Sequence, residues 1–144
     1  MKVEIFCLCD FAQPTRDGKL NILGLFDMLP VEQVPTRHGL FAVAIKLRIE
    51  NADAGEKKFK ISFFDPEGKP ILTGIEAVMN VETQPGLPNS NIQMVSLIPQ
   101  LPLASLGEYS IVLEVDGQPV ASTPLLVIQI QSLLPHLRPP LQTA

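Results

Sequence analysis

The chain has 144 residues, of which 46% are hydrophobic and 18% are charged, whereas roughly 25% are charged in an average soluble domain. This length suits one domain with a single core. The net charge of −4 excludes the basic surface that binding to nucleic acid or to an anionic membrane requires. We therefore expect no nucleic-acid partner and no membrane partner.

No targeting or membrane-spanning segment is expected. Glu4 and Asp10 flank an apolar run that is too short for the hydrophobic region of a secretory signal. The uncharged residues 117–135 contain Pro119 and Pro124, which a spanning helix would have to bury in lipid. The sequence therefore predicts a cytoplasmic protein.

Alternation of apolar and polar residues with a period of two predicts an all-β protein. The first strands are expected at residues 2–9 and 19–28. Cys7 and Cys9 share one face of the first strand, about 6.5–7 Å apart, which is too far for a relaxed disulfide. They are either small buried side chains in a reducing compartment or a redox pair or soft-metal site.

The clearest alternation covers residues 40–50 and is followed by a turn signal at 51–55. The other positions of this strand, including Ala42 and Ala44, are expected to face solvent. A second alternating run follows the turn, so we expect the two runs to form an antiparallel hairpin. The predicted inward-facing residues are Phe41, Val43, Ile45, Leu47 and Ile49 in the first run, and Phe59, Ile61 and Phe63 in the second.

Two further hairpins are predicted from turn residues. Residues 65–68, Asp-Pro-Glu-Gly, suit a type I turn that leads into a strand at 71–82. Asp116 and Gly117 suit a two-residue turn after a strand at 109–116. The returning strand, at about 118–131, contains prolines that cannot donate to a ladder, so it is expected at a sheet edge or bulged near Pro124.

With one more strand at residues 91–98, the count is about eight. This number favours an immunoglobulin-like β-sandwich of antiparallel strands with Greek-key connections, and a closed barrel is the alternative. The expected domain covers residues 1–131, followed by a proline-rich tail at 132–144.

Residues 83–107 contain no charged side chain. One interpretation is that they supply core residues and a packed loop. The other is that part of this stretch forms an exposed apolar surface or edge, together with two residues of the last strand, that binds a partner strand or a second copy. The candidate interface residues are Ile92, Met94, Leu97, Ile98, Leu101, Leu103, Leu126 and Ile128.

The residues that catalysis or metal binding requires are sparse. His38 is expected in an exposed loop, and His136 lies in the tail. Asp10, Asp17 and Asp27 lack the spacing of a calcium loop, so turn and strand-end roles are favoured over a divalent-ion site. We therefore predict no catalytic residue, no metal site and no cofactor.

Residues 3–12 and 18–27 resemble the start of a family of short uncharacterised bacterial proteins, and residues 107–117 with Pro124 resemble its closing hairpin. The resemblance implies a β-sandwich and carries no activity or ligand.

Three functional classes follow from these observations. The first is a non-catalytic protein-interaction or scaffold module, because an uncharged half without a polar cluster offers a surface rather than chemistry. The second is a self-assembling structural subunit that forms an oligomer or a filament. The third is an enzyme with an unrecognised site.

Overall fold

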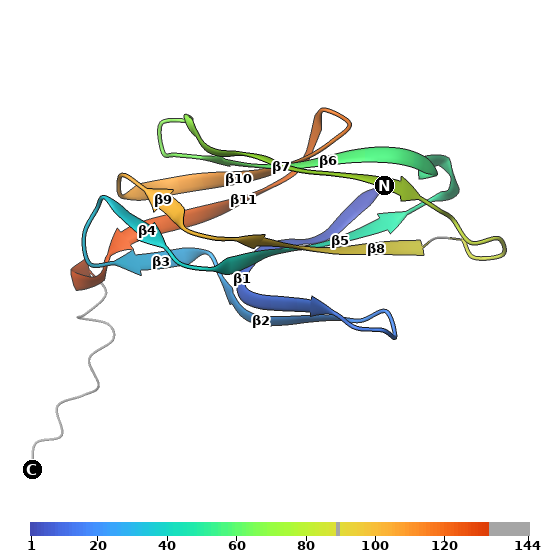
Figure 1. Ribbon diagram of the computed structural model, residues 1–144, viewed down its shortest axis with the longest axis horizontal. Coiled ribbons are helices and arrows are strands. Elements are labelled where there is room, and N and C mark those ends of the chain that lie inside the picture. Colours follow the sequence, from blue (N-terminus) through green and yellow to red (C-terminus); the bar gives the residue numbers. More distant parts are fainter. Residues whose placement is uncertain (89, 133–144) are drawn as a thin grey trace, which may run out of the picture.

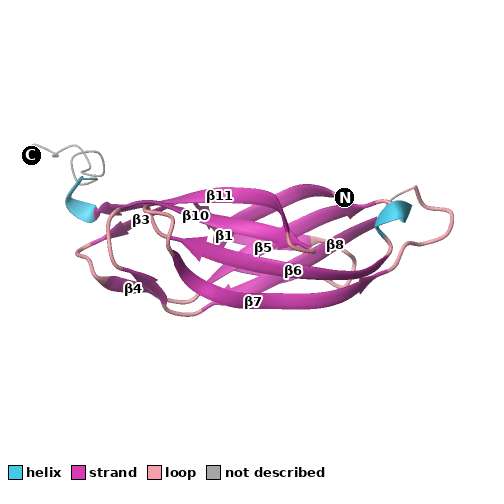
Figure 2. Cartoon of the chain, turned by 90° about the horizontal axis from the view of Figure 1, so that it is seen from above, coloured by secondary structure: helices cyan, strands magenta, loops and turns pink. Residues whose placement is uncertain are grey.

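The computed structural model describes residues 1–88 and 90–132 and shows two packed β-sheets (Figures 1 and 2). Sheet A has the order β2-β1-β5-β8, and sheet B has the order β3-β11-β10-β6-β7. The strands of sheet A are β1 (Lys2–Pro14), β2 (Leu20–Phe26), β5 (Phe41–Ile49) and β8 (Ser90–Ile98). Those of sheet B are β3 (Met28–Val31), β6 (Gly55–Phe64), β7 (Pro70–Val81), β10 (Gly107–Val115) and β11 (Gln118–Gln129).

Two short strands, β4 (Thr36–His38) and β9 (Leu101–Leu103), pair with each other, and two 3-10 turns, η1 (Asn51–Asp53) and η2 (Ile130–Ser132), complete the described elements. The protein is an immunoglobulin-like β-sandwich, so the predicted all-β fold is confirmed. The described part has more strands than expected. Residues 19–28 divide into β2 and β3 in different sheets, and β4 and β9 were not expected. The tail at residues 133–144 lies outside the described residues.

The core lies between the two sheets and follows the predicted alternation. All five predicted inward residues of β5 are at most 2% exposed, and Phe59, Ile61 and Phe63 of β6 face them. Tyr109 of β10 is also buried, and its hydroxyl donates a hydrogen bond to the carbonyl oxygen of Ser105 at 2.7 Å. A buried tyrosine that bonds to the backbone just before its strand is typical of immunoglobulin-like sandwiches.

The predicted hairpin between residues 40–50 and 59–63 is wrong. β5 pairs with β1 and β8, whereas β6 pairs with β7 and β10. The segment around η1 carries the chain from sheet A to sheet B. The two strands therefore face each other across the core, and facing strands show the same alternation as paired ones.

The other two predicted hairpins are confirmed. At the β6–β7 turn, the Asp65 carboxylate accepts hydrogen bonds from the backbone N–H groups of Glu67 and Lys69, at 3.0 and 2.8 Å. At the β10–β11 turn, Asp116 and Gly117 have φ values of +50° and +80°. Positive φ at both central residues matches the right-handed twist of the two strands that the turn joins.

β11 is an edge strand over part of its length, as its prolines predict. β3 pairs only with Leu126–Gln129, so residues 118–125 have β10 as their one neighbour in the sheet. The irregularity lies where Leu113 pairs with Ala121 and Glu114 with Pro119. The bulge is thus near Val120 rather than near Pro124.

A third layer covers part of the outer face of sheet A. The pairing of β1 with β2 is interrupted at Asp10 and Gly24, and the hairpin folds back beneath β5 and β8 (Figure 1). We call residues 11–23 the flap. Its inward side chains pack on small residues of the sheet, and the buried cluster contains Ala12, Leu20, Ile22, Cys7, Cys9, Ala42, Ala44 and Val95. Ala42 and Ala44 are therefore buried, contrary to the prediction that they face solvent, because the flap supplies a second apolar layer.

Candidate interaction surface

β8 forms one edge of sheet A and is built from nine uncharged residues without proline. Its pairing with β5 is continuous, from Ser90 opposite Ile49 to Ile98 opposite Phe41. The free side of such a strand carries a row of backbone donors and acceptors available to another strand. β8 therefore has the local structure of a strand-binding edge.

An apolar groove of about 280 Å³ lies between β8 and β7, the edge strand of the opposite sheet. Two methionines, Met79 and Met94, line it from the two sides. Unbranched thioether side chains adapt to differently shaped partners. The full lining is Ile45, Phe59, Ile61, Ile75, Glu76, Ala77, Met79, Met94, Val95 and Ser96.

Glu76 is the one charged residue of this lining. Its carboxylate lies 3.4 Å from the ammonium group of Lys58. Other ion pairs follow the same sheet, with Lys57 at 3.7 Å from Asp116 and Lys60 at 4.0 Å from Glu114. Three lysines of β6 thus pair with nearby carboxylates, and Glu76 is the one charged residue in an otherwise largely apolar lining.

The other described edges carry features that hinder strand addition. β7 contains Glu76, and its pairing with β6 is irregular after Ile61. β3 has four residues and includes Pro30, and the free part of β11 includes two prolines. The β2 pairing is interrupted at Gly24, where φ is +68°. Among the strands that the structure describes, β8 is the one long, regular, uncharged edge.

The structure places the predicted interface residues in three different settings. Ile92 and Met94 of β8 are partly buried, and Leu97 is 57% exposed on the outer face. These three residues belong to the β8 edge.

Ile98, Leu101 and Leu103 are fully buried, so their assignment to an interface is corrected. Ile98 ends β8 with its side chain in the core, and β9 pairs with β4 so that Leu101 and Leu103 point inward on either side of Pro102. The absence of charge in this part of the stretch reflects burial.

Leu126 and Ile128 lie elsewhere in the fold. Both are partly buried on β11, opposite Met28 and Pro30 of β3, at the end of sheet B away from β7. They do not join the β8 edge in one surface. The sequence gives no spacing from which this separation could be foreseen, because it depends on which sheet each strand joins.

The groove's β7 side was missed by sequence reasoning. Ile75, Ala77 and Met79 continue the alternation of an ordinary core strand, and nothing in that pattern shows that β7 is an edge above β8. The flap could have been predicted from Gly24, which directly follows it, because a glycine within an apolar strand indicates a bend or bulge.

His38 is a strand residue rather than an exposed loop residue. It is partly buried in β4, with its ring centroid 5.9 Å from that of Phe26 and 5.4 Å from that of Phe41. Burial lowers the pKa of His38, and the nearby Asp10 carboxylate opposes this effect. The ring therefore acts as an aromatic packing group.

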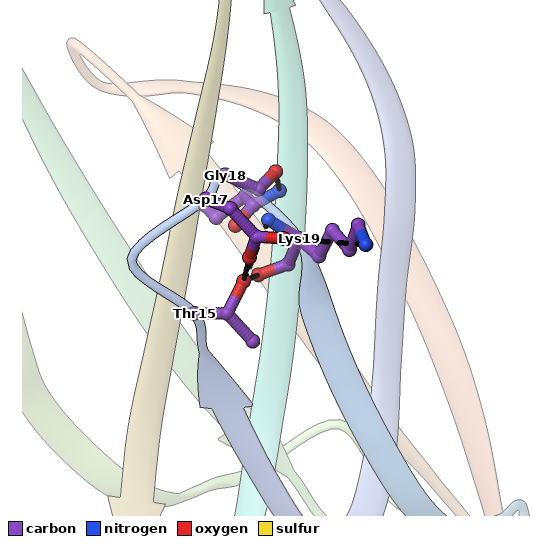
Figure 3. Close-up of polar contacts among 5 residues, drawn as sticks. Thr15, Asp17, Gly18 and Lys19 are labelled. Carbon is purple, nitrogen blue, oxygen red and sulfur yellow. Dashed lines mark hydrogen bonds and ion pairs between the residues drawn. The ribbon is translucent and has the colours of Figure 1, made fainter.

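Asp17 has the turn role that its residue type predicts, and Asp27 directly follows the end of β2, whereas Asp10 lies within β1 rather than at its end. The Thr15 hydroxyl donates to the Asp17 carboxylate and accepts from the backbone N–H of Lys19 at 2.9 Å, and the Lys19 ammonium lies 3.2 Å from Asp17 (Figure 3). The hydrogen bond from Thr15, followed by that from Lys19, lowers the pKa of Asp17. Within residues 1–88 and 90–132, no group of three or more His, Cys, Asp or Glu side chains could hold a metal ion.

The cysteines lie beneath the flap. Cys9 is fully buried, Cys7 is partly buried, and both are free thiols. Burial raises the pKa of both thiols, and the neighbouring Cys7 and Asp10 raise that of Cys9 further. This setting suits small packing side chains and not reactive thiolates.

Three solved structures illustrate the range of similar folds. An alkylpurine DNA glycosylase from Pseudomonas fluorescens has a TM-score of 0.47 and 7% identity, over 88% of this chain and 30% of that one. A β-glucosidase from Listeria innocua has a TM-score of 0.46 and 10% identity, over 71% and 15%. An immunoglobulin-like protein from Pseudomonas aeruginosa has a TM-score of 0.37 and 12% identity, over 88% and 94%.

The chain thus spans less than a third of the glycosylase and of the glucosidase, and such remote likeness transfers no activity to it. No curated protein matches the sequence. No helix in the described part of the chain is long and apolar enough to cross a membrane. A family model matches residues 4–128, which confirms the resemblance carried by the opening and closing residues. The chain belongs to a family of unknown function, DUF6941.

Proposed function

We propose that this protein is a non-catalytic interaction module that binds an extended segment of a partner protein along β8. The observation that carries the proposal is the regular, uncharged edge of β8 beside the β7–β8 groove. In strand addition, backbone hydrogen bonds supply affinity, and pockets for alternate side chains supply specificity. β8 offers the backbone hydrogen bonds, and the groove offers a pocket for side chains.

The groove defines the chemistry of the bound segment. Its lining is apolar apart from Ser96 and Glu76, and Glu76 pairs with Lys58. A charged side chain inserted there would be desolvated without a partner. The segment should therefore have apolar residues at the positions that face the groove and no proline where β8 requires a donor. Free cysteines are typical of a reducing compartment, so we expect the partner to be cytoplasmic.

The test is a display library of random extended peptides selected against the whole protein. Ser96→Lys places a charge in the groove, and Ser122→Lys is the matched control because Ser122 is exposed on β11. We expect selected peptides to bind the wild type and the control equally and to lose about tenfold or more in affinity for Ser96→Lys. Circular dichroism establishes that each variant is folded.

The methionine methyl groups report the position of binding by NMR. The signals of Met79 and Met94 should move on binding, whereas those of Met1 and Met28 should not, because the latter lie outside the groove. Failure of the library to yield a binder, or binders that ignore Ser96→Lys, would overturn the proposal.

A further inference from the structure

We infer that the segment bound by β8 is β8 of a second copy of this chain, so that two sheets A join edge to edge in a dimer. This inference rests on the proposed function and names its partner. It starts from the requirement that an added strand be free of proline and charge along the shared edge.

Within the described residues, β8 itself is the free-edged strand that meets this requirement. The free part of β11 contains Pro119 and Pro124, which lack the N–H groups that a ladder needs. β2 is interrupted at Gly24, and the exposed part of β7 carries Glu76.

A two-fold axis through the middle of β8 pairs the free edges of both copies with each other. An antiparallel pairing centred on Met94 places Gln93 of one copy opposite Val95 of the other and Ile92 opposite Ser96. Every facing pair is then uncharged. The pairing repeats the same contacts twice, as an isologous interface requires.

The charge distribution permits this contact despite a net charge of −4 on each copy. The ion pairs of Lys57, Lys58 and Lys60 lie on sheet B, and Glu4 of sheet A pairs with Arg48 at 2.8 Å on β1 and β5. β8 itself thus carries no charge, and the nearest charged residues of sheet A are Lys46 and Arg48 on the neighbouring strand β5. Nine residues from each chain are fewer than the roughly 20–30 a side of a standard interface, so the dimer should be weak.

Sedimentation velocity from micromolar to millimolar protein tests the inference. The wild type should shift from monomer to dimer with concentration. Gln93→Lys places two like charges on neighbouring strands of the dimer and should weaken association about tenfold or more. A lysine can still donate to the Gly18 carbonyl, which Gln93 bonds at 2.8 Å, so the flap contact can be kept. Val78→Lys, on an exposed residue of β7, is the control and should leave association unchanged.

Cysteine cross-linking locates the contact. In single variants at positions 93, 94 and 95, Met94→Cys should form an intermolecular disulfide most readily under mild oxidation, whereas Val78→Cys should not exceed the wild type. A wild type that remains monomeric, a dimer insensitive to Gln93→Lys, or a dimer that cross-links at none of the three positions would overturn the inference. A monomer that still binds library peptides in the groove would remove the second copy as partner and leave the proposed function intact, whereas loss of both would overturn both.

Discussion

Gly24 lies so close to Asp10 that a methyl group on its Cα would overlap the Asp10 carboxylate. Gly24 also has a φ of +68°, a conformation that side-chain-bearing residues rarely adopt. The bend that folds the flap over sheet A thus depends on a missing side chain. Gly24→Ala should lower the free energy of unfolding by about 1–3 kcal/mol, measured by urea denaturation, because the backbone is strained and the Asp10 side chain must move.

Gly68→Ala separates the two contributions to that loss. Gly68 has a φ of +84° with nothing near its missing Cβ, so this change should cost only the backbone strain, about 1 kcal/mol. Asp10→Ala should recover part of the loss in the Gly24→Ala background because it removes the nearest oxygen. Equal costs for the two glycine substitutions would contradict the steric role of Asp10.

The flap should control the reactivity of the thiols beneath it. Cys9 is fully buried and its pKa lies above the ordinary value of 9.0, so alkylation by iodoacetamide should be slow at neutral pH. Gly24→Ala should accelerate alkylation of Cys9, read by mass spectrometry of the digested protein. Gly68→Ala, which lies far along the chain in the β6–β7 turn, should leave the rate near that of the wild type.

Tyr109 fixes the start of β10 through its hydroxyl group, which donates to the Ser105 carbonyl at 2.7 Å and accepts from the Ser105 N–H at 3.3 Å. Tyr109→Phe should therefore cost about 1–2 kcal/mol in thermal or urea unfolding, because the partly buried backbone groups of Ser105 lose their partner. Ser105→Ala keeps both backbone groups and should cost much less. A larger effect of Ser105→Ala than of Tyr109→Phe would contradict this role of the hydroxyl.

Asp116 serves the β10–β11 turn in two ways. Its φ is +50°, and its carboxylate accepts a hydrogen bond from the Lys58 N–H at 2.9 Å. Asp116→Ala should destabilise the protein by about 1–2 kcal/mol. Asp116→Asn should cost far less, since asparagine tolerates positive φ and keeps an acceptor oxygen. Similar unfolding midpoints for Asp116→Ala and Asp116→Asn would contradict the roles of the positive φ and of the acceptor oxygen.

His38 should make stability depend on pH. Burial lowers its pKa below 6.5, so the folded state favours the neutral ring. As the pH falls below 6.5, the unfolded state takes up the proton first, and the free energy of unfolding decreases until the folded-state pKa is passed. The unfolding temperature of the wild type should therefore fall more between pH 7.5 and about pH 5 than that of His38→Gln. Parallel curves for the two proteins would exclude this contribution.

The alternation at residues 40–50 predicted both the strand and its core face, because a half-buried strand leaves that pattern whatever it pairs with. The same pattern could not predict the partner. β5 and β6 are close in sequence and belong to different sheets, and the connection around η1 has no turn chemistry that distinguishes a hairpin from a crossing. Local residues specify strands, whereas pairing depends on the whole set of strands.

The candidate surface was predicted only in part, because its position also depends on how the strands pair. The lack of charge at residues 83–107 has two causes that composition cannot separate, exposure at the β8 edge and burial at Leu101 and Leu103. Ala42 and Ala44 gave no sign of their burial, because alanine is equally acceptable on a wet face and beneath the flap. Turn residues such as Asp65 were predicted well since their roles are local.

The parallel pairing of β3 with β11 joins Met28 to Leu126, and the backbone N–H of Leu126 donates to the carbonyl oxygen of Asp27 at 2.8 Å. A contact between segments so distant along the chain forms only after a large loop has closed. Folding should therefore be slow, with the local β6–β7 and β10–β11 hairpins formed early and the β3 contact late. During synthesis, the sandwich cannot close along this seam until the residues up to Gln129 have left the ribosome.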